Sequence, residues 1–230
     1  MKISTAGESH GKGLFGMIEG LPAGLKIDTD EIDGYLALRQ SGYGRGARQK
    51  IEHDRVEILS GVRDRVTLGS PVTLAVWNRD YENWKFCMAP EGCDTSARTL
   101  TKVRPGHADL TGLKKFGGTD ARNILERASA RETAVRVAAG TVCRQLLRAL
   151  GVEVSGYVRS VGNVSDEGEY TFDALSGRLG ELFMMDAGKQ AEAMRLIDAC
   201  REAGDTCGGV AELRVRGLKS GFGSCMTYPE

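Results

Sequence analysis

The chain has 230 residues, of which 31 are Lys or Arg and 31 are Asp or Glu, so its formal net charge is zero. A chain of this length can bury a sizeable core, and its balanced charge gives little support to nucleic-acid or membrane-surface binding. No stretch is apolar enough to span a membrane, and the start lacks the apolar core of a secretion signal, so we expect the cytoplasm.

The first predicted element is a short edge strand over residues 1–5, which runs into the sequence AGESHGKG. This stretch matches G-x-S-x-G and leaves three interpretations open: a hydrolase nucleophile turn, a histidine that transfers protons, or a plain turn. A nucleophile turn requires a helix directly after it. Because Gly13, Gly16 and Gly20 follow, we expect a strand there instead, which disfavours the hydrolase interpretation.

A short helix is predicted next, over residues 28–40 (DTDEIDGYLALRQ). Its first residues are acidic or hydroxyl-bearing and can cap the start, and Gly42 ends it. Ile32, Tyr35 and Leu36 share one face of this helix, which is the face expected to be buried.

Two strands and a loop follow this helix. Residues 55–62 and 70–78 are rich in Val, Ile and Leu and are bounded by Gly, Pro or Asn, as is typical of strands. Residues 79–99 are polar and irregular, and a loop of this length suggests a lid or a binding loop.

The strongest helical pattern covers residues 129–150, and Gly151 stops it. A strand is predicted over residues 152–162, a helix over residues 186–204, and a last strand over residues 208–218. Strands and helices interleave along the whole chain, so the sequence predicts an α/β or α+β fold. The apolar residues of the strongest helix recur at three- and four-residue spacing: Val135, Ala139, Val142, Leu146 and Leu150.

The six cysteines form no C-x-x-C pair, and no histidine lies at zinc-ligand spacing from two of them. We therefore interpret them as free thiols, mostly buried or incidental, and expect no metal site.

Two loops place arginines among glycines. RQSGYGRGARQKIE contains Arg39, Arg45 and Arg48, and VRPGHADLTG contains Arg104 beside His107. Glycine lets a backbone approach a ligand closely, and the guanidinium group grips a carboxylate or phosphate at two points. A run of charges is most often a solvated face, but glycines alternating with cations favour an anionic ligand.

His10 and His107 are two of three histidines, and both lie in glycine-flanked loops. Imidazole can gain or lose a proton near neutral pH, so we interpret this pair as candidate proton-transfer groups. His53 lies among charged residues at the start of a strand and is expected to be a surface residue.

A fourth stretch, NILERASARETAVRVAAG, places Arg127, Ser129 and Arg131 near the start of the strongest helix. A helix start favours anions, and residues four apart on a helix face the same way. The same residues also fit a capping box between Ser129 and Glu132. Both interpretations stay open.

Together, these stretches predict a small substrate with several negative charges, held by arginines, with two histidines available to move protons. Elimination or transfer of phosphate fits this picture. No P-loop and no dinucleotide-binding glycine motif is present.

The stretches GESHGKG, RQSGYGRGARQKIEHD, RPGHADLTG and ERASARETAVRVAAG resemble, in order and spacing, the signature stretches of chorismate synthase. The resemblance is specific up to about residue 162 and weaker beyond. It implies one domain over residues 1–230 with an α+β fold, a β-α-β sandwich whose helices pack between or against mixed sheets.

The resemblance also implies an activity. Chorismate synthases form chorismate from 5-enolpyruvylshikimate 3-phosphate by 1,4-anti elimination of phosphate, the last step of the shikimate pathway. They require reduced FMN, which is not consumed overall, and NADPH is a possible source of its electrons. The family further implies a homotetramer.

Site residues follow from the matching motifs. His107 resembles the histidine that protonates the departing phosphate, and His10 the one that protonates reduced flavin. Arg127, Ala128 and Ser129 match a flavin-binding stretch, in which Ala128 replaces a common serine. Arg39 and Arg45 also match positions assigned to NADPH. The positions that match substrate-binding residues are Ser9, Arg39, Arg45, Arg48, Arg104, Ser129 and Arg131.

The chain departs from the family in its later part, where an Asn-Ala flavin contact, a Lys-Pro-Thr-Ser-type loop, a further basic residue and an Asp that acts with the flavin are expected and not found. This difference predicts a fragment or a truncated product. The alternative function is accordingly a non-catalytic module that binds a phosphorylated carboxylic acid.

Overall fold

The structure is a computed structural model that describes residues 1–44, 53–176 and 180–222. The chain divides into two compact units. The first comprises Met1–Gln40 and Gly46–Cys143, and the second comprises Ser41–Arg45 and Arg144–Glu230. Each unit has a sheet of its own, and the single domain expected over residues 1–230 stays a prediction.

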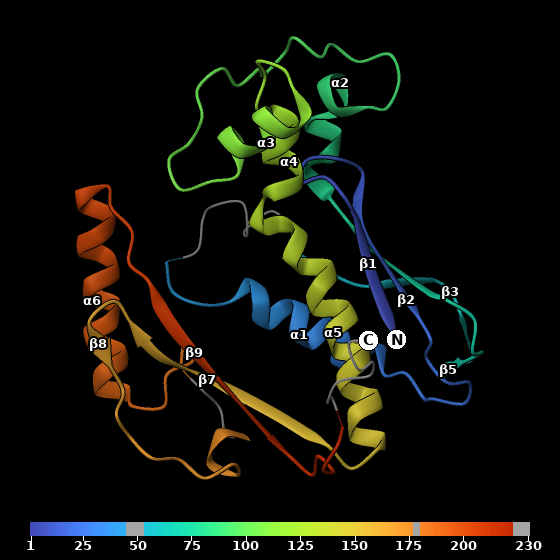
Figure 1. The fold of residues 1–230 in the computed structure, drawn as a ribbon, viewed down its shortest axis with the longest axis vertical. Coiled ribbons are helices and arrows are strands. Elements are labelled where there is room, and N and C mark those ends of the chain that lie inside the picture. Colours follow the sequence, from blue (N-terminus) through green and yellow to red (C-terminus); the bar gives the residue numbers. More distant parts are fainter. Residues whose placement is uncertain (45–52, 177–179, 223–230) are drawn as a thin grey trace, which may run out of the picture. The chain divides into compact units, whose positions relative to one another are not determined.

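The first unit is built on a four-stranded antiparallel sheet in the order β1-β2-β6-β3 (Figure 1). β1 (Lys2–Gly7) lies at the edge, as predicted, and pairs with β2 (Gly13–Glu19). β6 (Val72–Trp77) and β3 (Glu57–Ser60) complete the sheet. Because a strand rather than a helix follows the GESHG turn, the nucleophile-turn interpretation is excluded.

Two helices cover this sheet. α1 (Thr29–Gln40) buries Ile32 and Leu36, as its pattern predicted, and the Asp28 carboxylate caps its first turn. α5 (Thr133–Ala149) packs on β2: a Cβ added at Gly16 would lie 2.9 Å from a methyl carbon of Val135. Fully buried Leu, Ile and Val side chains from both layers form the core between them.

The helix predicted over residues 129–150 is interrupted at its start. α4 (Arg122–Ala128) ends at Ser129, whose ψ of 144° is extended, and a 3₁₀ turn, η3 (Ala130–Glu132), precedes α5. The Ser129 hydroxyl accepts a hydrogen bond from the amide of Arg131, so serine favours a local turn over a continuous helix. The predicted end was right, since Gly151 adopts φ +79° after α5.

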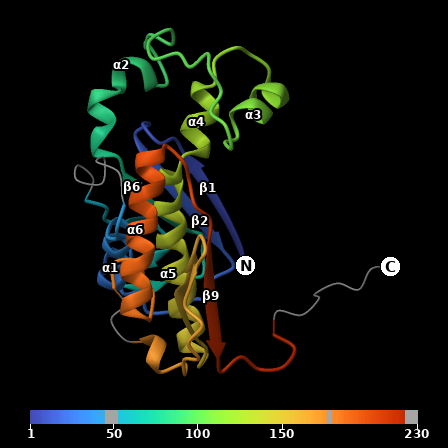
Figure 2. The ribbon, with the colours of Figure 1, turned by 90° about the vertical axis from the view of Figure 1, so that its left-hand side faces the viewer.

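Two segments predicted as loops contain short helices. Residues 79–99 include η2 (Arg79–Asn83) and α2 (Lys85–Met88), and the VRPGHADLTG stretch leads into α3 (Asp109–Phe116). These elements gather with α4 at one end of the unit (Figures 1 and 2). Short polar helices lack the repeated apolar spacing that identifies longer ones.

A minor hairpin in the first unit pairs β4 (Val62–Arg63) with β5 (Val66–Thr67).

The second unit has a three-stranded antiparallel sheet, in the order β8-β7-β9, and one long helix (Figure 1). Its strands are β7 (Glu153–Val161), β8 (Val164–Ser165) and β9 (Gly209–Arg216), and a 3₁₀ turn, η4, spans Ala174–Ser176. The helix is α6 (Ala187–Ala203), with Asp186 as its cap and left-handed Gly204 at its end. The strands at 152–162 and 208–218 and the helix at 186–204 are thereby confirmed.

Across the described segments of both units, no helix is both long and apolar enough to cross a lipid bilayer. Cys87, Cys93, Cys143, Cys200 and Cys207 carry free thiols, of which Cys87 is buried and the others are partly exposed. Cys225 lies outside the described residues.

Gly7 allows β1 and β2 to approach at the GESHG turn, and alanine there is expected to destabilise the first unit. Gly7 has φ +106°, and a Cβ would lie 2.3 Å from the carbonyl oxygen of Gly13. We expect Gly7→Ala to lower the free energy of unfolding by about 3 kcal/mol, because strain and a backbone clash add. Urea denaturation followed by tryptophan fluorescence measures this, since both tryptophans, Trp77 and Trp84, belong to the first unit.

Gly24→Ala is the matched control. Gly24 also has a positive φ, +88°, but a Cβ there meets nothing within 4 Å. We expect it to cost roughly 1 kcal/mol from backbone strain alone. Equal losses in the two variants would contradict a role for the close approach of the strands.

Candidate active site

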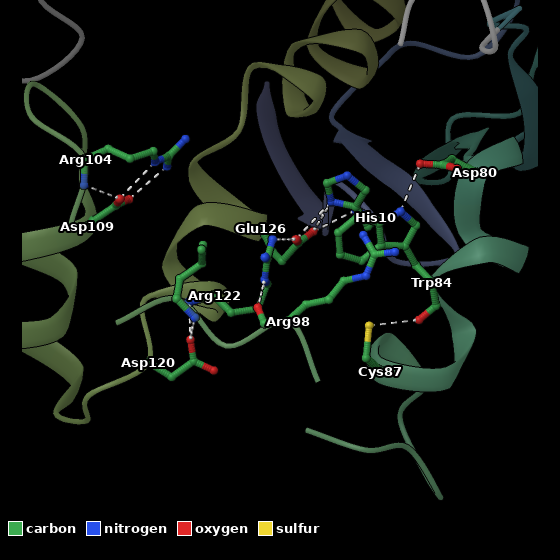
Figure 3. A network of polar contacts seen from close by, with 11 residues as sticks. His10, Asp80, Trp84, Cys87, Arg98, Arg104, Asp109, Asp120, Arg122 and Glu126 are labelled. Carbon is green, nitrogen blue, oxygen red and sulfur yellow. Dashed lines mark hydrogen bonds and ion pairs between the residues drawn. The ribbon is translucent and has the colours of Figure 1, made fainter. Parts of the chain in front are cut away.

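The centre of the candidate site is a histidine held by a buried carboxylate (Figure 3). His10, in the turn between β1 and β2, places its ring Nδ1 2.9 Å and 3.0 Å from the two carboxylate oxygens of Glu126. The backbone N–H of His10 donates to Oε2 of the same carboxylate at 2.7 Å. Arg122, one turn earlier on α4, donates to Oε1 at 3.2 Å.

These contacts keep Glu126 ionised although its side chain is fully buried. Burial alone would raise the pKa of the Glu126 carboxyl group. The hydrogen bonds from the ring and amide of His10, its positive charge when protonated, and Arg122 outweigh burial, so the pKa is lowered. A second backbone contact, from the amide of Ser9 to the carbonyl oxygen of Glu126 at 2.9 Å, ties the turn to α4.

An aromatic side chain lies against the His10 ring. The ring centroids of His10 and Trp84 are 3.8 Å apart, and the indole N–H of Trp84 donates to Asp80 at 3.0 Å (Figure 3). The guanidinium group of Arg98 lies 3.9 Å from the Trp84 ring, and that of Arg122 lies 5.3 Å from it. Trp84 comes from the segment predicted as a binding loop, so this segment does contribute to the surroundings of His10.

A second buried ion pair supports the same turn. Arg131 donates from Nη1 to both carboxylate oxygens of Asp54, at 2.7 Å and 2.6 Å, and from Nε to Asn78 at 2.8 Å. The side-chain amide of Asn78 in turn donates to the carbonyl oxygens of Glu8 and Gly11, at 3.0 Å and 2.8 Å. The ion pair therefore holds the GESHG turn through Asn78.

Arg39 reaches the same region from the end of α1. Its guanidinium group donates to the Thr133 hydroxyl at 3.0 Å and to the carbonyl oxygen of Ala130 at 2.9 Å, and it lies 3.6 Å from Asp54. Arg39 and Arg131 thus share one carboxylate, which places two of the predicted anion-binding arginines side by side.

Arg127 and Arg131 do not share a helix face, contrary to prediction. The helix is broken at Ser129, and the Arg127 side chain contacts β1. Its guanidinium group donates to the Thr5 hydroxyl at 2.9 Å and lies 3.3 Å from the Glu132 carboxylate. The capping box was right in part: Ser129 caps the 3₁₀ turn η3, but the Glu132 carboxylate binds Thr5 and Arg136 rather than the amide of Ser129.

His107 lies on an exposed turn closed by an ion pair. Arg104 donates to Asp109 through its side chain, at 2.9 Å to each oxygen, and through its amide at 3.0 Å (Figure 3). Between them, Gly106 has φ +68°, and the Nδ1 of His107 lies 2.9 Å from the carbonyl oxygen of Pro105. The turn thereby presents the His107 ring to solvent.

The Arg104–Asp109 pair predicts an acid-dependent loss of stability. The hydrogen bonds from Arg104 outweigh burial and lower the pKa of Asp109 from 3.8 to about 2. Because this pKa is lower in the folded state, the stabilisation is present above about pH 4 and is lost as the pH falls toward 2. We expect Asp109→Asn to lower the free energy of unfolding by about 1–2 kcal/mol at pH 7, allowing for the partial exposure of Arg104.

Urea denaturation of both proteins at pH 7, 4 and 2.5 tests this expectation. The difference between wild type and Asp109→Asn should shrink as the pH falls. Subtracting the two curves removes the contributions of Glu126 and Glu132, whose pKa values are also lowered. A difference that stays constant over this range would contradict the assigned pair.

The structure brings together only part of the predicted site. Ser9 and His10 meet Glu126, and Arg39 meets Arg131 through Asp54. No hydrogen bond or ion pair within the described segments joins His107 to His10, so their convergence on one cavity stays a prediction. His53 is exposed, as expected, and Arg45 and Arg48 lie outside the described residues.

The residues that build this site but were not predicted from the sequence include Glu126, Arg122, Trp84, Asp54 and Asn78. Glu126 lies within a quoted motif, in NILERA, but nothing local distinguishes a buried carboxylate from a solvated one. Asp54 directly follows His53 in a run of charged residues, which suggests a surface. Only the fold shows that both carboxylates are buried.

The fold and the site define an α+β protein in which a buried carboxylate holds a histidine, an arrangement typical of enzymes that transfer protons. The chain belongs to the chorismate synthase family, whose family model matches residues 1–228.

Individual relatives agree with this assignment. The chain is 52% identical to the chorismate synthase of Desulforudis audaxviator, over 99% of this chain and 60% of the relative, and 51% identical to that of Limosilactobacillus fermentum, over 97% and 60%. A crystal structure of a chorismate synthase superimposes with a TM-score of 0.71 and 37% identity, over 93% of this chain and 57% of that one. The chain thus spans about 60% of the length of these curated relatives.

Proposed function

We propose that the protein carrying this chain is a chorismate synthase, which eliminates phosphate from 5-enolpyruvylshikimate 3-phosphate in the 1,4-anti sense to give chorismate. The observation that carries the proposal is the family match over residues 1–228. The site supports it chemically, because elimination of phosphate needs proton-transfer groups beside cations, and His10 and His107 occur with several arginines.

The arginines and histidines take distinct roles in this proposal. Arg39, Arg45, Arg48 and Arg104 bind the phosphate and carboxylate groups of the substrate, with Ser129 beside them. Ser9 is buried and belongs to the turn that carries His10. His107, exposed on its turn, gives a proton to the departing phosphate. Arg131 was predicted to contact substrate directly, but it is 7% exposed and bound to Asp54. Its contribution is therefore to hold the turn that carries His10.

The residues present fit the phosphate end of FMN in charge and in donor type. Arg127 binds Thr5 and Glu132 but is 44% exposed in its side chain, and the Ser129 hydroxyl follows two residues later, so this stretch holds both a cation and a hydrogen-bonding group. We propose that Arg127, Ala128 and Ser129 hold reduced FMN. When bound, it supplies the electron-rich ring that this elimination requires, and His10 holds a proton near the site. We further propose that NADPH binds at Arg39 and Arg45. The protein is proposed to be a homotetramer and to be located in the cytoplasm.

Anaerobic incubation of the purified protein with 5-enolpyruvylshikimate 3-phosphate and reduced FMN tests the function, with chorismate measured directly. Formation of chorismate supports the proposal. Calorimetry with the substrate alone, without FMN, measures whether the protein binds the substrate. Binding without turnover would overturn the proposed function and establish the non-catalytic module instead.

A further inference from the structure

We propose that Glu126 is a positioning residue that keeps a proton on Nδ1 of His10 and so makes Nε2 the ring atom through which His10 takes up and releases its proton. The proposal rests on the function proposed above, in which His10 transfers a proton, and it assigns a role to a residue that none of the quoted motifs singled out.

The first step concerns where the proton lies. An ionised carboxylate accepts hydrogen bonds and donates none. Glu126 receives donors from the amide of His10 and from Arg122, and both of its oxygens lie within 3.0 Å of Nδ1. Nδ1 must therefore be the donor in this contact. In neutral His10 the proton is then on Nδ1, and Nε2 carries the lone pair.

The second step concerns the orientation of the ring. The amide and the ring of one residue bind the same carboxylate, so the backbone and the side chain of His10 are fixed against a single group. Trp84 packs against the ring with a centroid distance of 3.8 Å and restricts its tilt. Glu126 itself lies on α4 and is fully buried, so it cannot follow a moving ring.

The third step concerns charge. When His10 is protonated, its positive charge faces a carboxylate that is shielded from water, where the attraction is stronger than at a surface. Arg122 pairs with the same carboxylate, so Arg122 and the amide of His10 still donate to it when His10 has given up its proton. Among the described residues, the charged groups recorded near the ring include Glu126, which contacts it directly, Arg122, which pairs with Glu126, and Arg98 and Asp80, which contact Trp84.

The proton transfer at His10 involves one proton and one electron pair, both at Nε2. Protonated His10 gives the Nε2 proton to the bound acceptor, and the electrons of that N–H bond stay on Nε2 as a lone pair. Nδ1 keeps its proton, and Glu126 stays ionised throughout. When His10 is protonated again, the proton binds at the same atom, Nε2.

Nitrogen-15 NMR of the histidine rings tests the proposal without any turnover. The chain has three histidines, so His53→Gln and His107→Gln variants assign the His10 signals. Above the pH at which the ring becomes neutral, wild type should show a protonated Nδ1 and an unprotonated Nε2. A neutral ring protonated at Nε2 in wild type overturns the proposal, whatever the variants do.

Glu126→Gln supplies the second arm. Its amide keeps the shape of the side chain but can donate to Nδ1, so the neutral ring should shift toward the form protonated at Nε2. Asp166→Asn is the control: Asp166 is also a buried carboxylate, it binds Tyr170 and the amides of Gly168 and Asp186, and it belongs to the second unit. It should leave the His10 signals unchanged. An unchanged ring in Glu126→Gln overturns the proposal.

Kinetics separate this inference from the proposed function. In the active protein, Glu126→Gln should lower kcat by about 10- to 100-fold with little change in KM, because the substrate is bound by other residues. Glu126→Asp retains the charge and should recover part of the loss. If wild type forms no chorismate but its ring is protonated at Nδ1, the function fails and the positioning role stands. If wild type is active and Glu126→Gln is equally active, the positioning role fails alone.

Discussion

Alanine in place of His10 or of His107 is expected to slow chorismate formation at least about a hundredfold, in line with general acid–base contributions of roughly 10²–10⁴. The two losses have different origins. His107 lies on an exposed turn and, in the proposed function, gives a proton to the departing phosphate. His10 lies between Glu126 and Trp84, where its charge and orientation are controlled. Steady-state kinetics with saturating reduced FMN measures both variants.

His53→Ala is the matched control, because His53 is exposed and was assigned no role. Its turnover should equal that of wild type. Circular dichroism of all three variants confirms that the fold is retained. A His10 or His107 variant with wild-type turnover would refute the role proposed for that residue, and a loss in His53→Ala would show that the assay responds to something other than site chemistry.

Neutralising Asp54 is expected to produce the largest loss of stability in the first unit. Asp54→Asn leaves the Arg131 guanidinium buried, with 6% of its side chain exposed, and without its closest carboxylate. Breaking a buried ion pair from one side costs about 3–5 kcal/mol, because the remaining charge is neither paired nor hydrated. Urea denaturation followed by tryptophan fluorescence measures the change.

Two further variants show whether the loss comes from the unpaired charge. Asp54→Asn combined with Arg131→Met should be more stable than Asp54→Asn alone, since the stranded charge is removed. Arg136→Gln breaks the partly exposed pair with Glu132 and should cost less than about 0.5 kcal/mol. A double variant that is no more stable than Asp54→Asn would contradict this explanation.

Regular elements with local signals could be predicted from the sequence. α6 begins at a capping aspartate, Asp186, and ends at left-handed Gly204, as its residues indicated. β2 follows a glycine-rich turn and was distinguished from a helix by Gly13, Gly16 and Gly20. Such features depend on residues a few positions apart, so they are visible without the fold.

Predictions failed where a local alternative competed with a pattern. The helix predicted from residue 129 begins only at Thr133, because the hydroxyl of Ser129 stabilises a turn. α2 and α3 are too short for a periodic signal, so loops were predicted at both places.

The sequence by itself determined the family, the main strands and helices, and the candidate proton-transfer residue His10. Only the tertiary structure decided which partners these residues have. His10 meets a carboxylate 116 positions away, and Arg131 meets one 77 positions away. Whether a carboxylate is solvated or buried against a histidine or an arginine depends on the packing of distant segments, and that packing has no local signature in the chain.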